Sequence, residues 1–345
     1  MHLLMTIAAA IFVLGLLVLA HELGHFATAK WTGMRVDEFA IGFGPKIWSV
    51  TRGETTYSVR AIPLGGFNDI AGMDPSQKDT DGRGFCDKSI PARMLVIVAG
   101  SAMNVLLPIL LFFGVIYFNG YSEPSNEPVF GQVVEDYPAA SAGLMAGDRV
   151  LAINGATIET WKDFSKTLDA LEENQSITLK YERDGQASEV TLTPVHEGSR
   201  NLIGVKSNSI TTYPGVIESM GLAVERTIAF IVMMLSALVD LIASPSQADV
   251  SGPIGIAQMA GQAASFGFAS LMSFAALLSL NLAIINMLPV PALDGGHFVT
   301  LMLEALRGKP LTPKALMYTQ RIGVALMLLL MLVATKNDIV RVLHL

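Results

Sequence analysis

The chain has 345 residues, of which 51% are hydrophobic and only 15% are charged, a balance typical of a membrane protein rather than a soluble domain. Its 23 basic and 30 acidic residues give a net charge of −7, which argues against a general nucleic-acid-binding role. The single cysteine, Cys86, excludes an internal disulfide and a cysteine-based metal site, and we interpret it as incidental.

The N-terminus contains an apolar segment, from Leu3 to about Phe26, that is long enough to cross a membrane. A secretory signal peptide is the alternative, because the apolar run ends at the small residue Ala20. The segment lacks a positively charged leading part, however, and cleavage there would leave the adjoining sequence His-Glu-Leu-Gly-His, residues 21–25, at a free end. We therefore predict a first transmembrane helix.

The next region links this helix to a second apolar segment, Met94 to about Phe118. It contains two strand-like runs around Arg52-Gly53, which predict a β-hairpin or small sheet. Basic residues flank its membrane ends: Lys30, Arg35, Lys46, Arg83, Lys88 and Arg93. The positive-inside rule therefore predicts that this loop is cytoplasmic.

Residues 121–213 form a soluble insert with 14 acidic and 7 basic residues and several alternating, strand-like pieces. Its centre resembles the PDZ domains of bacterial proteases in a set of small, turn-forming and capping residues: Pro138, Ala139, Ala142, Gly143, Leu144, Gly147, Asp148 and the turn Asn154-Gly155. A turn-rich β-domain of another kind is the alternative. Because the insert has few cations near the membrane, we predict that it lies outside the cytoplasm.

A third apolar segment ends near Leu293, and no charged residue occurs between Val250 and that position. Its first part, residues 251–270, is rich in glycine, alanine and serine and is predicted to be interfacial or re-entrant. The crossing helix is predicted to begin near Leu271.

Two shorter segments, Thr227–Val239 and Ile322–Thr335, are uncharged for 13 and 14 residues, so their length does not separate a span from an interfacial helix. Glu225 and Arg226 adjoin the first and favour an interfacial helix. Extending the second backwards adds only Arg321, which can reach a headgroup, and this favours a fourth span.

The motif His21-Glu22-Leu23-Gly24-His25 is typical of zinc-dependent hydrolysis. The two histidines are four residues apart, so on a helix they share one face and can bind one ion. Glu22 lies beside them and can act as general base for a metal-bound water. Two histidines hydrogen-bonded within a helix bundle are the alternative, but a glutamate without a polar partner is costly in a membrane and indicates function.

The sequence NMLPVPALDGGH, residues 286–297, supplies a candidate for the third ligand. Catalytic zinc uses three protein ligands and one open position. Asp294, at the end of the third predicted span and beside Gly295-Gly296, fits that role. The alternative is a carboxylate that caps a helix or turn.

The two motifs together resemble the site-2 protease family of intramembrane zinc metalloproteases, whose signatures are His-Glu-x-x-His in the first span and Asn-x-x-Pro-x-x-x-x-Asp-Gly in the third. The second signature is formed here by Asn286, Pro289, Asp294 and Gly295. The insert, the hairpin loop and the sequence AGSAMN in the second span extend the resemblance to the bacterial RseP group. Two departures are a single PDZ domain instead of a tandem pair, and Ser101 in place of the proline of Gly-Pro-x-x-Asn.

The resemblance implies that His21, His25 and Asp294 hold Zn²⁺ and that Glu22 activates water. It also implies that Asn286 holds the substrate strand or the developing oxyanion, and Asn104 becomes a further candidate substrate contact. The first and third spans then run inward and the second outward. A crossing by Thr227–Val239 would carry Asp294 to the opposite face, so that segment is predicted to lie on the membrane.

The predicted fold is a polytopic α-helical membrane protein with about four transmembrane helices, a membrane-associated β-hairpin region and an inserted PDZ domain. The domains are a catalytic membrane part over 1–120, the PDZ domain over 121–213, and an interfacial helix with the third and fourth spans over 214–345.

The predicted substrate is a single-span protein of the bacterial inner membrane, and the resemblance suggests an anti-sigma factor. A transmembrane helix must unwind before cleavage, and an edge strand within Ser49–Arg60 could receive it through main-chain groups at Ser58 and Val59. The PDZ domain would take a ligand peptide or the substrate ectodomain. A non-catalytic PDZ-bearing membrane scaffold is the main alternative, and a metal transporter is disfavoured by the apolar second and fourth spans.

Overall fold

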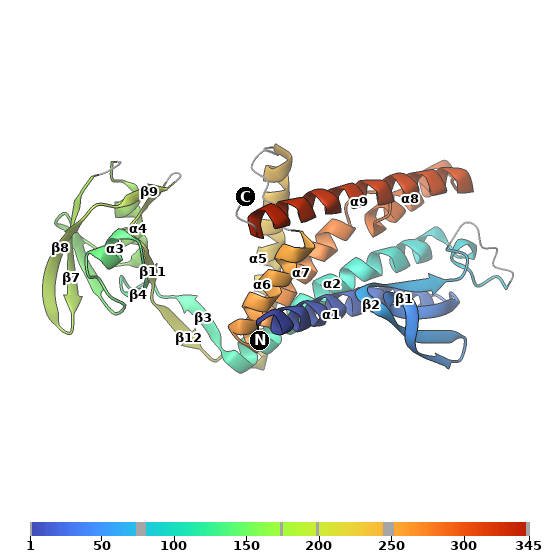
Figure 1. Cartoon of the computed structure of the whole chain (residues 1–345), viewed down its shortest axis with the longest axis horizontal. Helices are drawn as coiled ribbons and strands as arrows, with labels where there is room; N and C mark the ends of the chain where they lie inside the picture. Colours follow the sequence, from blue (N-terminus) through green and yellow to red (C-terminus); the bar gives the residue numbers. More distant parts are fainter. Residues whose placement is uncertain (1, 74–80, 173–174, 198–199, 244–251, 343–345) are drawn as a thin grey trace. The chain divides into compact units, whose positions relative to one another are not determined.

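The computed structural model describes residues 2–73, 81–172, 175–197, 200–243 and 252–342. It divides into two compact units (Figure 1). We call residues 1–119 and 215–345 the helical unit and residues 120–214 the inserted unit.

Seven α-helices of the helical unit fall within the described residues: α1 (His2–Trp31), α2 (Ile90–Asn119), α5 (Val216–Ala243), α6 (Pro253–Ser265), α7 (Phe268–Asn286), α8 (Asp294–Arg307) and α9 (Pro313–Val342). Five of them are long and apolar enough to cross a membrane: α1, α2, α5, α7 and α9. Their long uncharged stretches explain this, because a helix satisfies its own backbone hydrogen bonds and leaves apolar side chains to face lipid.

The third predicted span is shorter than the sequence indicates. The prediction that it ends near Leu293 is wrong, because α7 ends at Asn286. Pro289 and Pro291 follow, and proline lacks the N–H that would continue a helix. Ala292 has a φ of 78°, and a new helix, α8, then begins at Asp294. Asp294 is therefore the first residue of a separate helix.

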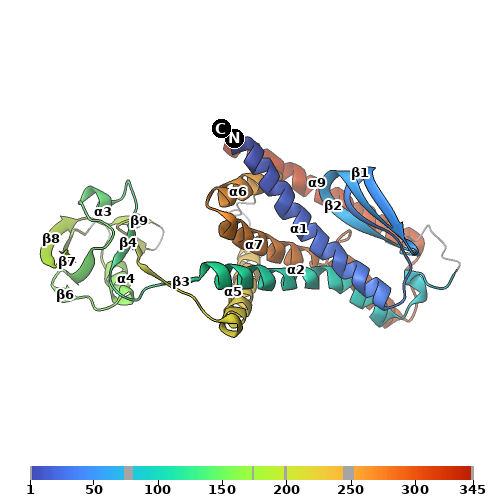
Figure 2. The same cartoon turned by 90° about the horizontal axis from the view of Figure 1, so that it is seen from below.

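The helices pack through small residues. α1 contacts α2 and α6, and α2 also contacts α7 (Figure 2). A Cβ atom on Gly24 of α1 would overlap the carbonyl of Ala99 in α2, and one on Gly261 of α6 would overlap Thr6 of α1. Small residues thus let these backbones approach closely, which is how helices associate in membranes.

The helix α5 runs crosswise to α1, α2 and α9 in both views (Figures 1 and 2). It extends beyond the uncharged segment Thr227–Val239 at both ends and includes Glu225 and Arg226. The Arg226 guanidinium lies over the Phe112 ring of α2, 4.9 Å from its centroid. An aromatic face stabilises a cation, which lets a charged residue pack against an apolar helix.

The helix α9 is fixed to α6 by a buried carboxylate. Asp338 accepts hydrogen bonds from the backbone N–H groups of Gly252 and Gly255, each at 2.9 Å. These N–H groups at the start of α6 have no partner within the helix, and the carboxylate also meets the positive end of the helix dipole. In its first half, α9 passes so close to Pro291 that a Cβ on Gly323 would overlap the proline carbonyl.

The strands β1 (Val36–Arg52) and β2 (Thr55–Ile70) turn at Gly53, whose φ is 63°. Each long strand bends, so that some of its residues have a paired neighbour on both sides. Ala40 pairs with Ser58 and with Phe67, and Ser58 also pairs with Ser49. Four segments therefore lie side by side in the order 46–52, 55–60, 36–41 and 66–70. The outer two are the edges of this sheet, which lies beside α1 (Figure 2).

The inserted unit is a small β-domain with its own core. Its largest sheet has the order β6-β5-β7-β8, formed by Ala156–Thr157, Arg149–Ile153, Ile177–Arg183 and Gln186–Leu192. Three two-stranded pairs join β3 (Tyr121–Pro124) to β12 (Ser209–Thr212), β4 (Phe130–Val133) to β11 (Val205–Ser207), and β9 (Val195–Glu197) to β10 (Arg200–Leu202). The helices are α3 (Pro138–Ser141) and α4 (Trp161–Asp169), and buried side chains include Phe130, Ile153, Phe164, Ile177 and Leu179.

Candidate functional site

Three side chains from two distant helices meet in the helical unit. His21 and His25 lie one turn apart on α1, and Asp294 begins α8. The two histidine Nε2 atoms are 3.1 Å apart, and Oδ2 of Asp294 lies 3.3 Å from that of His21 and 3.5 Å from that of His25. All three side chains are mostly buried, with exposed fractions of 12%, 12% and 16%. Among the described residues, they form the group of histidine, cysteine and acidic side chains that could hold a metal ion.

The geometry of these three atoms fits zinc. With bonds of about 2.0–2.2 Å, tetrahedral ligand atoms are separated by about 3.3–3.6 Å. The observed separations of 3.1, 3.3 and 3.5 Å are close to that range. Oδ2 of Asp294 is also a buried oxygen without a hydrogen-bond partner among the described residues. A buried unpaired carboxylate oxygen is costly, and a cation between it and the imidazoles would remove that cost.

Each histidine is held by a residue of α2. Nδ1 of His25 lies 2.7 Å from the carbonyl oxygen of Val96, so Nδ1 donates and Nε2 is left with its lone pair. Nδ1 of His21 lies 3.2 Å from Nδ2 of Asn104, whose Oδ1 is buried without a partner. A 180° turn of that amide exchanges its oxygen and nitrogen, so that Oδ1 accepts from Nδ1–H of His21. Both Nε2 atoms are then available to a metal.

Gly100 provides the space for the two imidazoles. A Cβ atom at this position of α2 would overlap Nε2 of His25 and come within 2.8 Å of Cε1 of His21. The close approach of α1 at Gly24 places the rings directly against the α2 backbone. Glycine is required here for the room it leaves rather than for an unusual backbone angle.

The two glycines after Asp294 let the loop fold onto the start of α8. A Cβ on Gly295 would overlap the carbonyl of Leu288, and one on Gly296 would overlap that of Val290. The ion pair between Arg93 of α2 and Glu304 of α8 also fixes this helix, with Nη1 and Oε1 2.6 Å apart. Together these contacts hold Asp294 towards α1.

His297 follows Asp294 by about one turn of α8 and is a third histidine near the site, which the sequence analysis did not single out. Burial lowers the pKa of His297, although the charge of Asp294 opposes this shift. The imidazole is therefore neutral at neutral pH.

Glu22 has a partner that the sequence analysis missed. Nδ2 of Asn68, in the edge segment 66–70 of β2, lies 2.7 Å from Oε2 of Glu22 and 2.8 Å from the Glu22 carbonyl oxygen. Asn68 is separated from Glu22 by 46 positions. The sequence offers no pattern that links the two, because the contact depends on how the sheet packs on α1.

The predicted edge strand at Ser58 and Val59 is wrong as placed, whereas the substrate contact of Asn104 stays a prediction. Asn104 is fully buried, and its Nδ2 lies 3.2 Å from Nδ1 of His21. Ser58 and Val59 lie on an inner segment of the sheet, so their main-chain groups pair with neighbouring segments on both sides. The strand 55–60 cannot accept a further strand.

The side chain of Ser58 has a structural partner instead. It is buried, and its hydroxyl donates to Oε1 of Glu38 at 2.6 Å. Burial of Glu38 alone would raise its pKa, but hydrogen bonds from Ser58, Arg60 and Lys46 outweigh this and lower the pKa below its usual value. Replacing Ser58 by alanine would remove one of these bonds.

Asn286 and Ser101 lie close in sequence to the site elements. Asn286 is the half-buried last residue of α7 and is not among the side chains that hydrogen-bond to the two histidines. Ser101 follows Gly100 on α2, and its hydroxyl is buried without a partner among the described residues.

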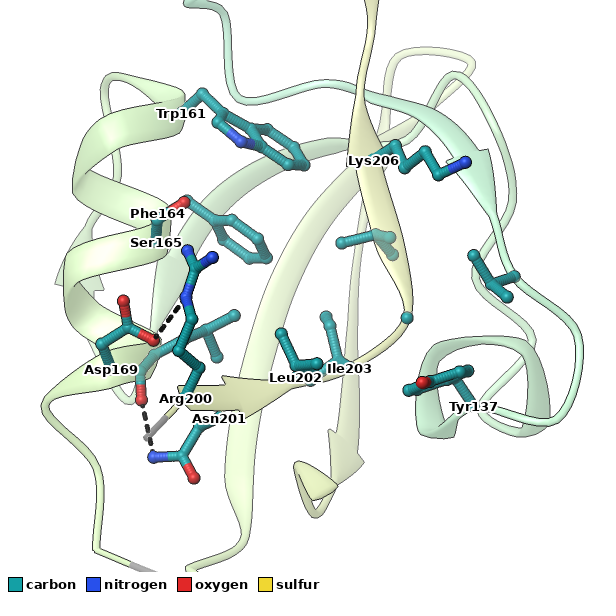
Figure 3. Close-up of a pocket in the computed structure, with 14 residues that line it drawn as sticks. Tyr137, Trp161, Phe164, Ser165, Asp169, Arg200, Asn201, Leu202, Ile203 and Lys206 are labelled. Atoms are coloured by element: carbon teal, nitrogen blue, oxygen red, sulfur yellow. Dashed lines mark hydrogen bonds and ion pairs between the residues drawn. The ribbon is translucent and has the colours of Figure 1, made fainter. Parts of the chain in front are cut away.

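The inserted unit contains a pocket of about 340 Å³ between α4 and the segment from β10 to β11 (Figure 3). Trp161 and Phe164 of α4 face Leu202 and Ile203 across it, and Arg200 and Lys206 lie on its rim (Figure 3). Asn201 Nδ2 donates to the Leu168 carbonyl at 3.0 Å and ties the two walls together. Since β11 pairs with β4 on one side, its other side faces this pocket.

Comparison with protein families gives one match over most of the chain. The model of peptidase family M50 matches residues 9–330, a range that includes His21, Glu22, His25 and Asp294.

The curated relatives are similar over nearly their whole length. "Regulator of sigma-W protease RasP" of Bacillus subtilis is 33% identical over 422 residues, covering 97% of this chain and 98% of the relative. "Zinc metalloprotease RasP" of Geobacillus kaustophilus is 34% identical over 416 residues, covering 97% of each. Among solved structures, a PDZ domain from Listeria monocytogenes is matched with a TM-score of 0.22 and 18% identity, covering 23% of this chain and 85% of that domain.

Proposed function

The chain belongs to peptidase family M50, the site-2 protease family, and is a zinc metalloprotease of the bacterial membrane; we propose that it cuts single-span membrane proteins inside their transmembrane segments. The observation that carries this proposal is the convergence of Asp294 with His21 and His25 next to Glu22. The two histidines and Glu22 lie on α1, a helix apolar enough to cross the membrane. Family membership favours an enzyme over a non-catalytic scaffold.

The proposed mechanism divides the work among the residues of the site. His21, His25 and Asp294 would hold the zinc ion. The chemistry that zinc supplies when bound is polarisation of the scissile carbonyl and acidification of water. Glu22 takes the proton of the attacking water and returns it to the leaving amine. Val96 and Asn104 keep the imidazoles oriented, and Asn286 holds the substrate strand or the developing oxyanion.

We propose that the unwound substrate pairs with the edge segment 66–70 of β2. Segment 66–70 is one of the two edges of the sheet, and Asn68 within it contacts Glu22. A strand added there gains main-chain hydrogen bonds and lies beside the general base. The other edge, 46–52, is separated from segment 66–70 by two strands.

Cysteine crosslinking distinguishes the two edges. In a Cys86→Ser, Glu22→Gln background, a model substrate with one cysteine in its cleaved segment should form a disulfide with Phe67→Cys. Ser49→Cys on the opposite edge is the matched control and should crosslink weakly. Stronger crosslinking at position 49 than at position 67 would place the substrate at the edge 46–52 and contradict this proposal.

We propose that α1 and α7 run towards the cytoplasm and α2 away from it, with α5 along the membrane surface. This brings Asp294 to the depth of His21, and the crosswise course of α5 supports it (Figures 1 and 2). A spanning α5 would carry Asp294 to the other face. The β1–β2 sheet is then cytoplasmic and the inserted unit extracytoplasmic.

Labelling with a membrane-impermeant thiol reagent tests this topology. In a Cys86→Ser background, Ser176→Cys in the inserted unit should react from outside intact cells, and Arg52→Cys should react only after permeabilisation. Thr55 is unsuitable for this purpose because it is buried and its hydroxyl donates to the carbonyl of Val36. Reaction of both cysteines from the same side would contradict the arrangement.

We propose that the inserted unit is a PDZ domain that docks or excludes substrates through the pocket beside β11. An extended peptide can pair with the free side of β11 while its side chains enter the apolar pocket between Trp161, Phe164 and Ile203. The sigma-W regulator named among the relatives supports a role in regulated proteolysis, and an anti-sigma factor is the substrate class that we propose.

Cleavage by the purified protein tests the proposed function. A model single-span substrate in detergent should be cut at a peptide bond within its apolar segment, and mass spectrometry of the products locates that bond. A chelator should stop the reaction and added zinc should restore it. Cuts confined to the soluble parts of the substrate would refute intramembrane cleavage.

A further inference from the structure

Asn68 is unusual because a single side-chain NH₂ group holds Glu22 at two points. Its Nδ2 contacts the Glu22 carbonyl oxygen at 2.8 Å and the carboxylate oxygen Oε2 at 2.7 Å. Both partners are oxygen acceptors, so only the NH₂ end of the amide can face them. The amide oxygen Oδ1 is buried without a hydrogen-bond partner among the described residues. Such a group costs stability and therefore needs an explanation.

The packing around Asn68 brings its strand directly against α1. Side chains alternate along a strand, so Gly66 and Asn68 face α1 while Phe67 faces away, beneath the Arg60 guanidinium. A Cβ on Gly66 would come within 2.9 Å of Cγ of Glu22 and of Cγ1 of Val18. The glycine therefore allows segment 66–70 to approach Glu22 closely enough for the amide to reach it.

We propose that Asn68 is a positioning residue that fixes the rotamer of the general base Glu22 and couples it to the substrate-binding edge. A glutamate on a helix has several side-chain rotamers, and a general base works only within hydrogen-bond reach of its water. The NH₂ group of Asn68 selects one rotamer by joining the carboxylate to the backbone of the same residue. Because Asn68 belongs to an edge strand, a substrate strand that pairs there orders the segment that holds the base. This inference rests on the proposed function.

Two isosteric substitutions test the inference. Asn68→Leu removes all polar atoms, and Asn68→Asp keeps an oxygen but replaces the NH₂ donors by a charge of the same sign as Glu22. We expect kcat for a model single-span substrate to fall about 10–100-fold in Asn68→Leu, which is the usual effect of losing a supporting hydrogen bond. The kcat of Asn68→Asp should fall by at least the same factor. KM should stay within about two-fold, because the substrate is held by main-chain groups.

Three further measurements distinguish a positioning role of Asn68 from damage to the structure. The zinc content and melting temperature of both variants should match the wild type. Thr56→Ala is the matched control, since it removes a side-chain hydrogen bond, to Thr51, elsewhere in the same sheet and should keep full activity. Loss of zinc or of thermal stability in both variants would show that Asn68 is structural, and unchanged kcat in Asn68→Leu would also overturn the proposal. A wild-type protein that cuts no membrane substrate would instead overturn the proposed function.

Discussion

Purified wild-type protein should contain about one zinc ion per chain, and the double variant His21→Ala, His25→Ala should contain almost none. The reason is that these residues supply two of the three atoms that lie within 3.5 Å of each other at the site. A single carboxylate of Asp294 cannot replace them, because one ligand leaves most of the ion's coordination to water. Proteolysis should be lost together with the metal. Elemental analysis by mass spectrometry measures the zinc directly.

The control for this experiment is another histidine. His196 in the inserted unit hydrogen-bonds to Asn201 and lies outside the group that could hold a metal. His196→Ala should therefore keep its zinc and its activity against a model substrate. Equal zinc contents in the double variant and the wild type would show that the ion is bound elsewhere, and the assignment of the ligands would fail.

Glu22→Gln should reduce proteolysis by about 10²–10⁴-fold, the contribution of a general base, while zinc binding stays near the wild-type level. The glutamine has the same shape but cannot accept the proton of water. Its amide oxygen can still accept the hydrogen bond that Asn68 donates, so the local structure should be kept. Cleavage of a model single-span substrate and zinc analysis on the same sample separate the two properties.

The matched control is Glu225→Gln on α5, where the carboxylate is exposed. That change removes the same charge at a distance from the site and should leave cleavage unaltered. Cleavage by Glu22→Gln at close to the wild-type rate would mean that another group accepts the proton.

The candidate metal ligands could be predicted from the sequence, because the spacing of the two histidines follows from the geometry of a single helix. His21 and His25 share a helix face through the four-residue period, and this requires no knowledge of the rest of the fold. Asp294 is indicated by its residue type and its glycine neighbours. Its position at the start of α8 could not be predicted, because the prolines of the preceding loop end α7 earlier than its hydropathy indicates.

The contacts that depend on strand order could not be predicted at all. The turn at Gly53 is visible in the sequence, but the second pairing of Ala40, with Phe67, involves a distant segment. The pairing of Ala40 with Ser58 makes 55–60 an inner strand, and its pairing with Phe67 makes 66–70 an edge, so the edge strand is not the predicted one. The pairing with Phe67 also brings Asn68 to Glu22. A short polar residue within a strand carries no local sign of such a role.

The space at Gly100 has a practical consequence for finding natural substrates. Alanine at this position would place a methyl group where the two imidazoles lie, although every ligand, the general base and the sheet edge would keep their own side chains. We expect such a chain to be a sterically blocked protease that keeps the side chains of its recognition surfaces. It could serve as bait in living cells, holding uncut partners that the active enzyme would release as fragments.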